Sequence, residues 1–267
     1  MTITPAEFMR AAPPSLAGNT PWASRYAAEL RQVVHEHARN SKRTLQKHLG
    51  PSELGTPCDR QVVGKLVGAP VTNHVVDPWP SIVGTATHAW LADAFTAWNT
   101  RHGFARWLAE QRVIPHPDHT GTADLYDGEE QAVVDHKVLG ESSMAKVRSV
   151  AGPSPRYQIQ LLLYGKGYRV LGLPVKRVAL AAYPRTAASL DGLYVWERAT
   201  GDHDDALIAE VFRLTDRRKA TAEEVLSGKR QLSTVAIAPD DDECFFCPFY
   251  RPQSKRDNGP GCPGPRT

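Results

Sequence analysis

The stretch Gly121–Lys137, GTADLYDGEEQAVVDHK, predicts a β-hairpin on which the rest of the fold depends. An Asp-Gly dipeptide separates two β-prone runs, and Asp-Gly in that setting is a common hairpin turn. If the loop covers residues 127–131, Asp124 lies opposite Val134 on the paired strand. The hairpin would therefore place an acidic side chain of one strand beside the end of the next strand.

Three charged side chains of this hairpin are expected to meet. Side chains two residues apart on a strand share a face, which puts Asp135 beside Lys137, with Asp124 joining them from the neighbouring strand. Hard divalent cations prefer carboxylate oxygens, and a bound cation can activate water and offset charge on a phosphoryl group. A lysine can orient that water or stabilise the developing negative charge. A surface hairpin with scattered charges would also produce Asp-x-Lys, so the hairpin alone leaves both interpretations open.

Other motifs accompany the hairpin in a fixed order. A G-x-x-x-H motif ends at His88 in a predicted helix, a strand candidate carries Glu110, and Gln160 and Tyr164 lie four residues apart on one helix face. This order, over residues 50–262, resembles the RecB-like branch of the PD-(D/E)xK nuclease superfamily, and most of all the Cas4-type exonucleases, including phage versions. The resemblance implies that Gln160 and Tyr164 position the lysine or the DNA backbone. Glu110 matches an acidic position of the family less closely.

The resemblance also implies a fold and a metal site. The fold is an α/β restriction-endonuclease-like core, with a central mixed β-sheet flanked by helices and with terminal segments tied by a cysteine-ligated cluster. His88, Asp124 and Asp135 would bind Mg²⁺ or Mn²⁺, and Lys137 would act on the attacking water. Taken alone, His88 favours a histidine that is satisfied within the core, and the resemblance reverses that preference.

Four cysteines occupy two places in the chain. Cys58 lies near the predicted N-terminal helices, and Cys244, Cys247 and Cys262 lie in the tail. This arrangement resembles the iron–sulfur site of Cas4-type nucleases, because four thiolates commonly hold a [4Fe–4S] cluster. The last cysteine lies further from the Cys-x-x-Cys pair than is usual in that family, and four thiolates also suit Zn²⁺. We expect the [4Fe–4S] cluster, with structural zinc and free thiols as the alternatives.

The composition is that of a globular protein with a mildly basic balance. The chain has 267 residues, a net charge of +3, and 41% hydrophobic and 23% charged residues. DNA binding would therefore depend on a local basic patch and not on bulk charge. Because no apolar run approaches the roughly 18 residues of a membrane span, and no apolar signal core is present, we expect a cytoplasmic protein.

Glycine and proline breaks, together with the periodicity of apolar residues, predict the organisation of the chain. We expect a flexible arm over 1–20, a helical region with Cys58 over 21–80, the nuclease core over 81–232 and a cysteine-rich tail over 233–267. Helices are predicted over 22–48, 85–101, 155–171 and 203–228, and strands over 105–114, 119–126, 132–139, 175–183 and 193–197. Residues 69–80 are predicted to form a loop, and 140–155 a flexible basic connection suited to phosphate contacts.

The function that we expect is that of a metal-dependent DNA exonuclease. It would hydrolyse phosphodiester bonds at DNA ends, single-stranded ends in particular, during recombination or DNA processing. A structure-selective endonuclease shares every motif and is one alternative. A DNA-binding accessory protein that uses the fold without cutting is the other, and the intact Asp124, Asp135 and Lys137 argue against it.

Overall fold

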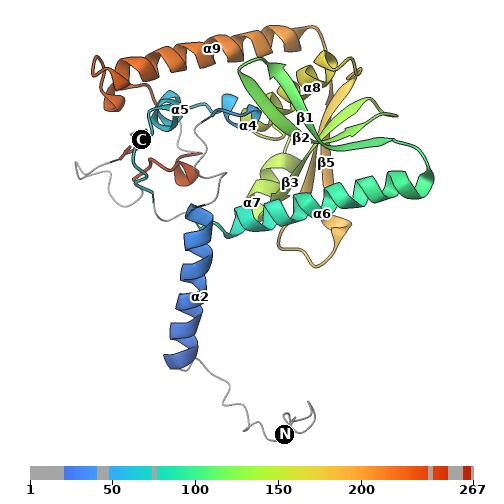
Figure 1. The fold of residues 1–267 in the computed structure, drawn as a ribbon, viewed down its shortest axis with the longest axis horizontal. Helices are drawn as coiled ribbons and strands as arrows, with labels where there is room; N and C mark the ends of the chain where they lie inside the picture. Colours follow the sequence, from blue (N-terminus) through green and yellow to red (C-terminus); the bar gives the residue numbers. More distant parts are fainter. Residues whose placement is uncertain (1–20, 41–47, 74–76, 240–242, 252–260, 266–267) are drawn as a thin grey trace, which may run out of the picture. The chain divides into compact units, whose positions relative to one another are not determined.

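The computed structural model describes residues 21–40, 48–73, 77–239, 243–251 and 261–265 (Figure 1). The chain divides into two compact units, Met1–Gln46 and Lys47–Thr267. In the first unit the structure describes helix α2 (Pro21–Arg39), none of whose residues is buried. This confirms the N-terminal part of the helix predicted over 22–48, whereas residues 41–47 and the predicted arm over 1–20 lie outside the described residues.

The second unit is built on a five-stranded sheet. Its strands follow the order β1-β2-β3-β4-β5, and their bounds are Trp107–His116, His119–Asp127, Ala132–Leu139, Arg177–Pro184 and Tyr194–Ala199. Strands β3 and β4 are parallel, and the other neighbours are antiparallel. A parallel pair requires a crossover, which here runs through α7 (Glu141–Arg148) and α8 (Pro155–Val170). The expected α/β class with a mixed sheet is confirmed.

Helices cover both faces of the sheet (Figure 1). Asp135 of β3 contacts α8, whereas the next residue, His136, contacts α6 (Trp79–His102). Because successive side chains of a strand point to opposite faces, α6 and α8 lie on opposite sides of β3. The remaining helical segments are α4 (Pro51–Leu54), α5 (Asp59–Leu66), α9 (His203–Leu226), η1 (Leu190–Gly192), η2 (Leu232–Thr234) and η3 (Cys244–Phe246).

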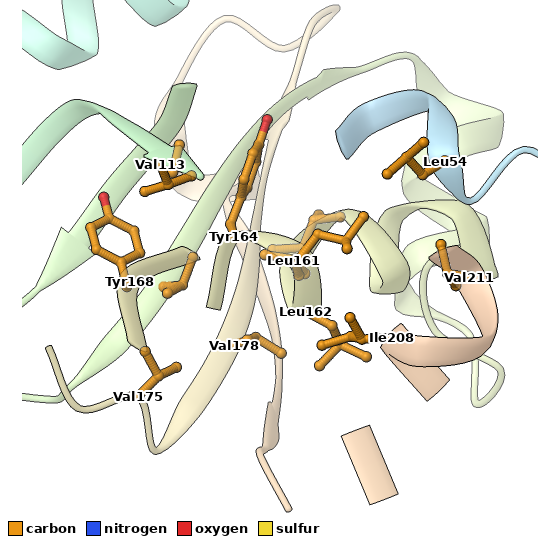
Figure 2. Packing of buried hydrophobic residues seen from close by; sticks show 14 of the residues in the cluster. Leu54, Val113, Leu161, Leu162, Tyr164, Tyr168, Val175, Val178, Ile208 and Val211 are labelled. Carbon is orange, nitrogen blue, oxygen red and sulfur yellow. The ribbon is translucent and has the colours of Figure 1, made fainter. Parts of the chain in front are cut away.

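The main hydrophobic core lies between α8, the sheet and α9. Figure 2 shows Leu161 and Leu162 of α8 with Val178 of β4 and Ile208 of α9, all of which are fully or almost fully buried. Burying one such side chain stabilises the fold by about 1.5–3 kcal/mol. The core therefore fixes the position of α8 against the strands that carry the hairpin acids.

Two predicted segments were wrong. Residues 140–155, predicted to be a flexible connection, contain helix α7, whose Met144 and Val147 are buried. The predicted loop over 69–80 is also too long, because α6 begins at Trp79 and has Pro80 in its first turn, where a missing N–H costs nothing. The predicted helix and strand types elsewhere agree with the structure, and their bounds differ by a few residues.

The register of the hairpin was predicted one residue out. Leu125 pairs with Val134, so the same register places Asp124 opposite Asp135 and not opposite Val134. The reason is Asp127, which remains in β2 opposite Ala132 and accepts hydrogen bonds from the turn N–H groups of residues 129 and 130. The turn is therefore one residue shorter than predicted.

Among the described residues, the structure contains no helix that combines the length and the apolar character needed to cross a membrane.

Candidate active site

Asp135 and Lys137 form a buried ion pair on β3. Nζ of Lys137 lies 2.6 Å from Oδ2 of Asp135, whose side chain is 1% exposed. Helix α8 completes the arrangement: Nε2 of Gln160 donates to Oδ1 of Asp135 at 2.9 Å and contacts the hydroxyl of Tyr164 at 3.2 Å. The structure thus brings together four of the residues predicted from the sequence.

Tyr157 is a neighbour of this pair that the sequence motifs did not indicate. Nζ of Lys137 lies 5.2 Å from the centre of the Tyr157 ring, which is within cation–π range. Tyr157 precedes Gln160 by three residues and therefore shares its helix face. That spacing was the signal available in the sequence.

A second group of side chains offers atoms that could bind a metal ion. His88 from α6, Glu110 from β1 and Asp124 from β2 place one ligand atom each within 4.8 Å of one another. Nδ1 of His88 is 3.3 Å from Oδ1 of Asp124, and Oδ2 of Asp124 accepts the backbone N–H of His136 at 2.7 Å. A search of the described residues for three or more histidine, cysteine or acidic side chains with such close spacing finds this group alone.

The backbone at Glu110 departs from ordinary strand geometry. Glu110 has φ = 50°, a left-handed conformation that is uncommon for a residue other than glycine. The pairing on either side, Ala109 with Leu125 and Gln111 with Ala123, puts Glu110 opposite Asp124. Such conformations concentrate at functional sites, where the surrounding structure imposes them. Glu110 was the least secure match in the sequence, yet it lies within the ligand group.

These residues fit a hard divalent cation. One imidazole nitrogen and carboxylate oxygens suit Mn²⁺ or Mg²⁺. A cation about 2.1 Å from each ligand would hold them at most about 4.2 Å apart, so only a small closure of the group is needed. Asp135, which the sequence also predicted as a metal ligand, is not part of this group, and its two oxygens are engaged by Gln160 and Lys137.

The surroundings of the two acids shift their pKa values in opposite directions. Burial raises the pKa of Asp135 to about 6, although the Lys137 ammonium opposes this shift. Burial would also raise the pKa of Asp124, but the His88 hydrogen bond and the charges of His88 and Lys137 outweigh it, and its pKa falls below the usual range. Burial acts to lower the pKa of Lys137, whereas Asp135 and Asp124 raise it above its ordinary value. Lys137 therefore remains a cation at neutral pH.

His136 packs behind the ligand group on the α6 side. Its ring stacks on Phe95 with centroids 5.7 Å apart, and Nδ1 lies 3.4 Å from the hydroxyl of Tyr183. Burial lowers the pKa of His136 to about 4, so the ring is neutral at physiological pH. The sequence alone gave no indication that His136 would be buried here, because its burial depends on contacts with α6 and β4.

The four cysteines line one pocket, although they come from distant parts of the chain. Cys58 precedes α5, and Cys244, Cys247 and Cys262 come from the C-terminal segment, where Cys262 pairs with Tyr250 in an isolated β-bridge. Among the described residues, no three of their sulfur atoms lie within 4.8 Å of one another. Burial raises the pKa of Cys247 to about 11, so that thiol would be protonated without a metal.

Comparisons with known proteins give weak likenesses. No family model and no curated protein matches the chain. Among solved structures, an alkaline exonuclease, LHK-Exo from Laribacter hongkongensis, is similar with a TM-score of 0.47 and 15% identity, over 68% of this chain and 93% of that chain. The same exonuclease in complex with dAMP gives a TM-score of 0.47 and 15% identity, over 68% of this chain and 94% of that chain. A phage related exonuclease from Haemophilus somnus 129PT has a TM-score of 0.33 and 12% identity, over 52% of this chain and 69% of that chain. Likenesses at this level do not establish a function, which must be argued from the site.

Proposed function

We propose that this protein is a metal-dependent DNA nuclease that acts as an exonuclease at DNA ends. The observation that carries the proposal is the Asp135–Lys137 ion pair on β3, with Asp124 of the neighbouring strand β2 grouped with His88 and Glu110. Phosphodiester hydrolysis needs a group that orients water and positive charge near the phosphoryl oxygens. This constellation provides both.

Each residue would have a distinct task. Asp124, Asp135, Glu110 and His88 would hold Mg²⁺ or Mn²⁺, which supplies Lewis acidity and lowers the pKa of bound water. Lys137, held as a cation by Asp135, would orient the attacking water or stabilise the negative charge that develops on the phosphoryl oxygens. Gln160 and Tyr164 would keep Asp135 in position from α8.

We further propose that the protein belongs with the Cas4-type exonucleases and that the four cysteines hold a structural [4Fe–4S] cluster. Support comes from the common pocket of Cys58, Cys244, Cys247 and Cys262. Zinc bound at about 2.3 Å by four thiolates would hold the sulfurs about 3.8 Å apart. Among the described residues, no three of the sulfurs lie within 4.8 Å of one another, a spacing that does not match a closed zinc site.

The experiment that tests the activity compares end-labelled linear DNA, single-stranded and duplex, with covalently closed circular DNA in Mg²⁺. An exonuclease releases nucleotides from linear substrates and leaves the closed circle intact. Cutting of the circle would replace the exonuclease with a structure-selective endonuclease. Binding without hydrolysis of any substrate would indicate an accessory DNA-binding protein and refute the proposal.

A further inference from the structure

Arg60 of α5 places its guanidinium against one of the four cysteines. Nη1 of Arg60 donates to Sγ of Cys262 at 3.5 Å. The other donors are fixed by backbone carbonyls: Nε donates to Val235 at 2.9 Å, and Nη2 donates to Val235 at 2.8 Å and to Ser233 at 2.6 Å. Because the guanidinium is a rigid plane, anchoring these donors aims the remaining N–H group at the sulfur.

The positive charge of Arg60 lies against backbone carbonyls and a thiol. Among the described residues, no Asp or Glu oxygen lies within ion-pair distance of its guanidinium. Glu243 also lines the pocket of the cysteines, but it is engaged by Arg156 at 3.0 Å. A guanidinium is always protonated in proteins, and burying part of it without a counter-charge is costly. The pocket is therefore arranged for a group that carries net negative charge.

A metal centre held by four thiolates has that charge. Four thiolates outweigh the positive charge of either an oxidised [4Fe–4S] core or Zn²⁺, so the complex is an anion. A charge-assisted N–H···S bond stabilises a thiolate over a thiol and favours added electrons on the centre. Arg60 is the described side chain that supplies both the charge and such a bond to Cys262.

We propose that Arg60 is a positioning residue of the cysteine centre, which holds the Cys262 thiolate in place and offsets the negative charge of the metal–thiolate group. This inference rests on the proposed binding of a metal by the four cysteines. It assigns to Arg60 a role distinct from tethering the tail, which Arg156 also does through Glu243.

The test compares Arg60→Gln, Arg60→Lys and the matched control Arg156→Gln, all purified without oxygen. Metal release to a chelator in excess is followed for each, and for an iron–sulfur centre the reduction potential is measured as well.

Loss of a residue that hydrogen-bonds to a metal ligand typically weakens metal binding about 10–100-fold. We expect Arg60→Gln to release metal at least about tenfold faster and to have a more negative potential. Arg60→Lys keeps the charge and should lie between Arg60→Gln and the wild type. Arg156→Gln should lower the melting temperature without changing either metal property.

The outcomes separate the inference from its premise. A wild-type protein with four titratable thiols and no metal would overturn the cysteine centre and the role of Arg60 together. A metal-loaded wild type in which Arg60→Gln matches Arg156→Gln in metal release and potential would overturn the role of Arg60 alone. If the centre is zinc, the release rates decide the question. If Arg60→Gln does not fold, the release rate of Arg60→Lys is the test. Metal release at the wild-type rate from Arg60→Lys would contradict a role for the planar guanidinium and its bond to Cys262.

Discussion

Nε2 of Gln160 donates a hydrogen bond of 2.9 Å to Oδ1 of Asp135, and this bond joins helix α8 to the strand that carries the proposed catalytic lysine. The opposite oxygen of the same carboxylate pairs with Lys137. Asp135 is therefore held from two sides before any metal binds. A carboxylate fixed in this way loses little conformational freedom on binding a cation, which favours a preorganised site.

Removing the Gln160 contact should weaken activity without abolishing it. In Gln160→Ala, Oδ1 of Asp135 loses its donor in a buried setting, and an unsatisfied buried group costs about 1–3 kcal/mol. We expect the hydrolysis rate to fall about tenfold, which corresponds to about 1.4 kcal/mol. Gln158→Ala is the matched control, because Gln158 lies on the same helix but donates to the carbonyl of Pro153. Equal losses in both variants would mean that helix damage, and not the Asp135 contact, is responsible.

Replacing Glu110 should change the metal requirement. If Glu110 is a ligand, Glu110→Gln should raise the Mg²⁺ or Mn²⁺ concentration for half-maximal activity by about tenfold or more. Excess chelator should abolish the wild-type activity, and Ca²⁺ should bind but support hydrolysis poorly. Glu130→Gln, an exposed acid in the hairpin turn, serves as the control. An unchanged metal requirement in Glu110→Gln would remove Glu110 from the ligand set.

Metal binding should weaken as the pH falls through about 6. The pKa of Asp135 is raised by burial to about 6, so below that pH the carboxyl is protonated and no longer a good cation ligand. Asp124 has a lowered pKa and stays ionised in the same range, whereas its hydrogen bond raises the pKa of His88 above the ordinary 6.5, so the loss is assigned to Asp135 and His88 together. Titration of the protein with Mn²⁺ at pH 7.5, 6.5 and 5.5 measures the effect. Affinity that is constant over this range would contradict the assignment.

His119 should make the folded state sensitive to acid. Its ring is 3% exposed, stacks on Phe212, and has Nδ1 3.1 Å from the carbonyl of Leu49. Burial lowers the pKa of His119 below its ordinary 6.5, so in acid the unfolded chain binds a proton that the folded one resists. The stabilisation is thus complete above about pH 6.5 and is lost as the pH falls towards the folded-state pKa.

The measurement for His119 is chemical unfolding at pH 7.5 and pH 5. His119→Phe keeps the stacking and loses the titration, so its free energy of unfolding should fall less between the two pH values than that of the wild type. His203→Phe, at an exposed position that begins α9, should retain the wild-type difference. An identical pH difference in His119→Phe and the wild type would show that another group is responsible.

Sequence patterns predicted the elements of this fold better than their mutual contacts. The alternation around Asp135 and Lys137 was enough to put both on one face of a strand, because that geometry is local. The register was predicted one residue out because the side chain of Asp127 binds the turn N–H groups and keeps Asp127 in the strand. Helix α7 was missed because its polar sequence has little apolar periodicity, and tertiary packing of two residues decides it.

The candidate site shows the same division between local and tertiary information. Asp124, Asp135, Lys137, Gln160 and Tyr164 could be named from motif spacing, and the structure places them near one another. The spacing of Tyr157 from Gln160 puts both on one helix face, but nothing in the local sequence indicates that the His136 ring packs beside His88. The left-handed backbone at Glu110 is likewise a property of the folded sheet.

The most direct test of the account is Mg²⁺-dependent hydrolysis of linear DNA by the wild type, Lys137→Met and Asp135→Asn, with folding checked by circular dichroism. Removing one partner of a buried ion pair can cost about 3–5 kcal/mol of stability, so the double variant Asp135→Asn/Lys137→Met, which leaves neither charge unpaired, is included. The account predicts wild-type hydrolysis that chelator abolishes, and a rate at least about 100-fold lower in every folded variant. Hydrolysis at the wild-type rate by folded Lys137→Met or Asp135→Asn, or by the wild type in excess chelator, would contradict it.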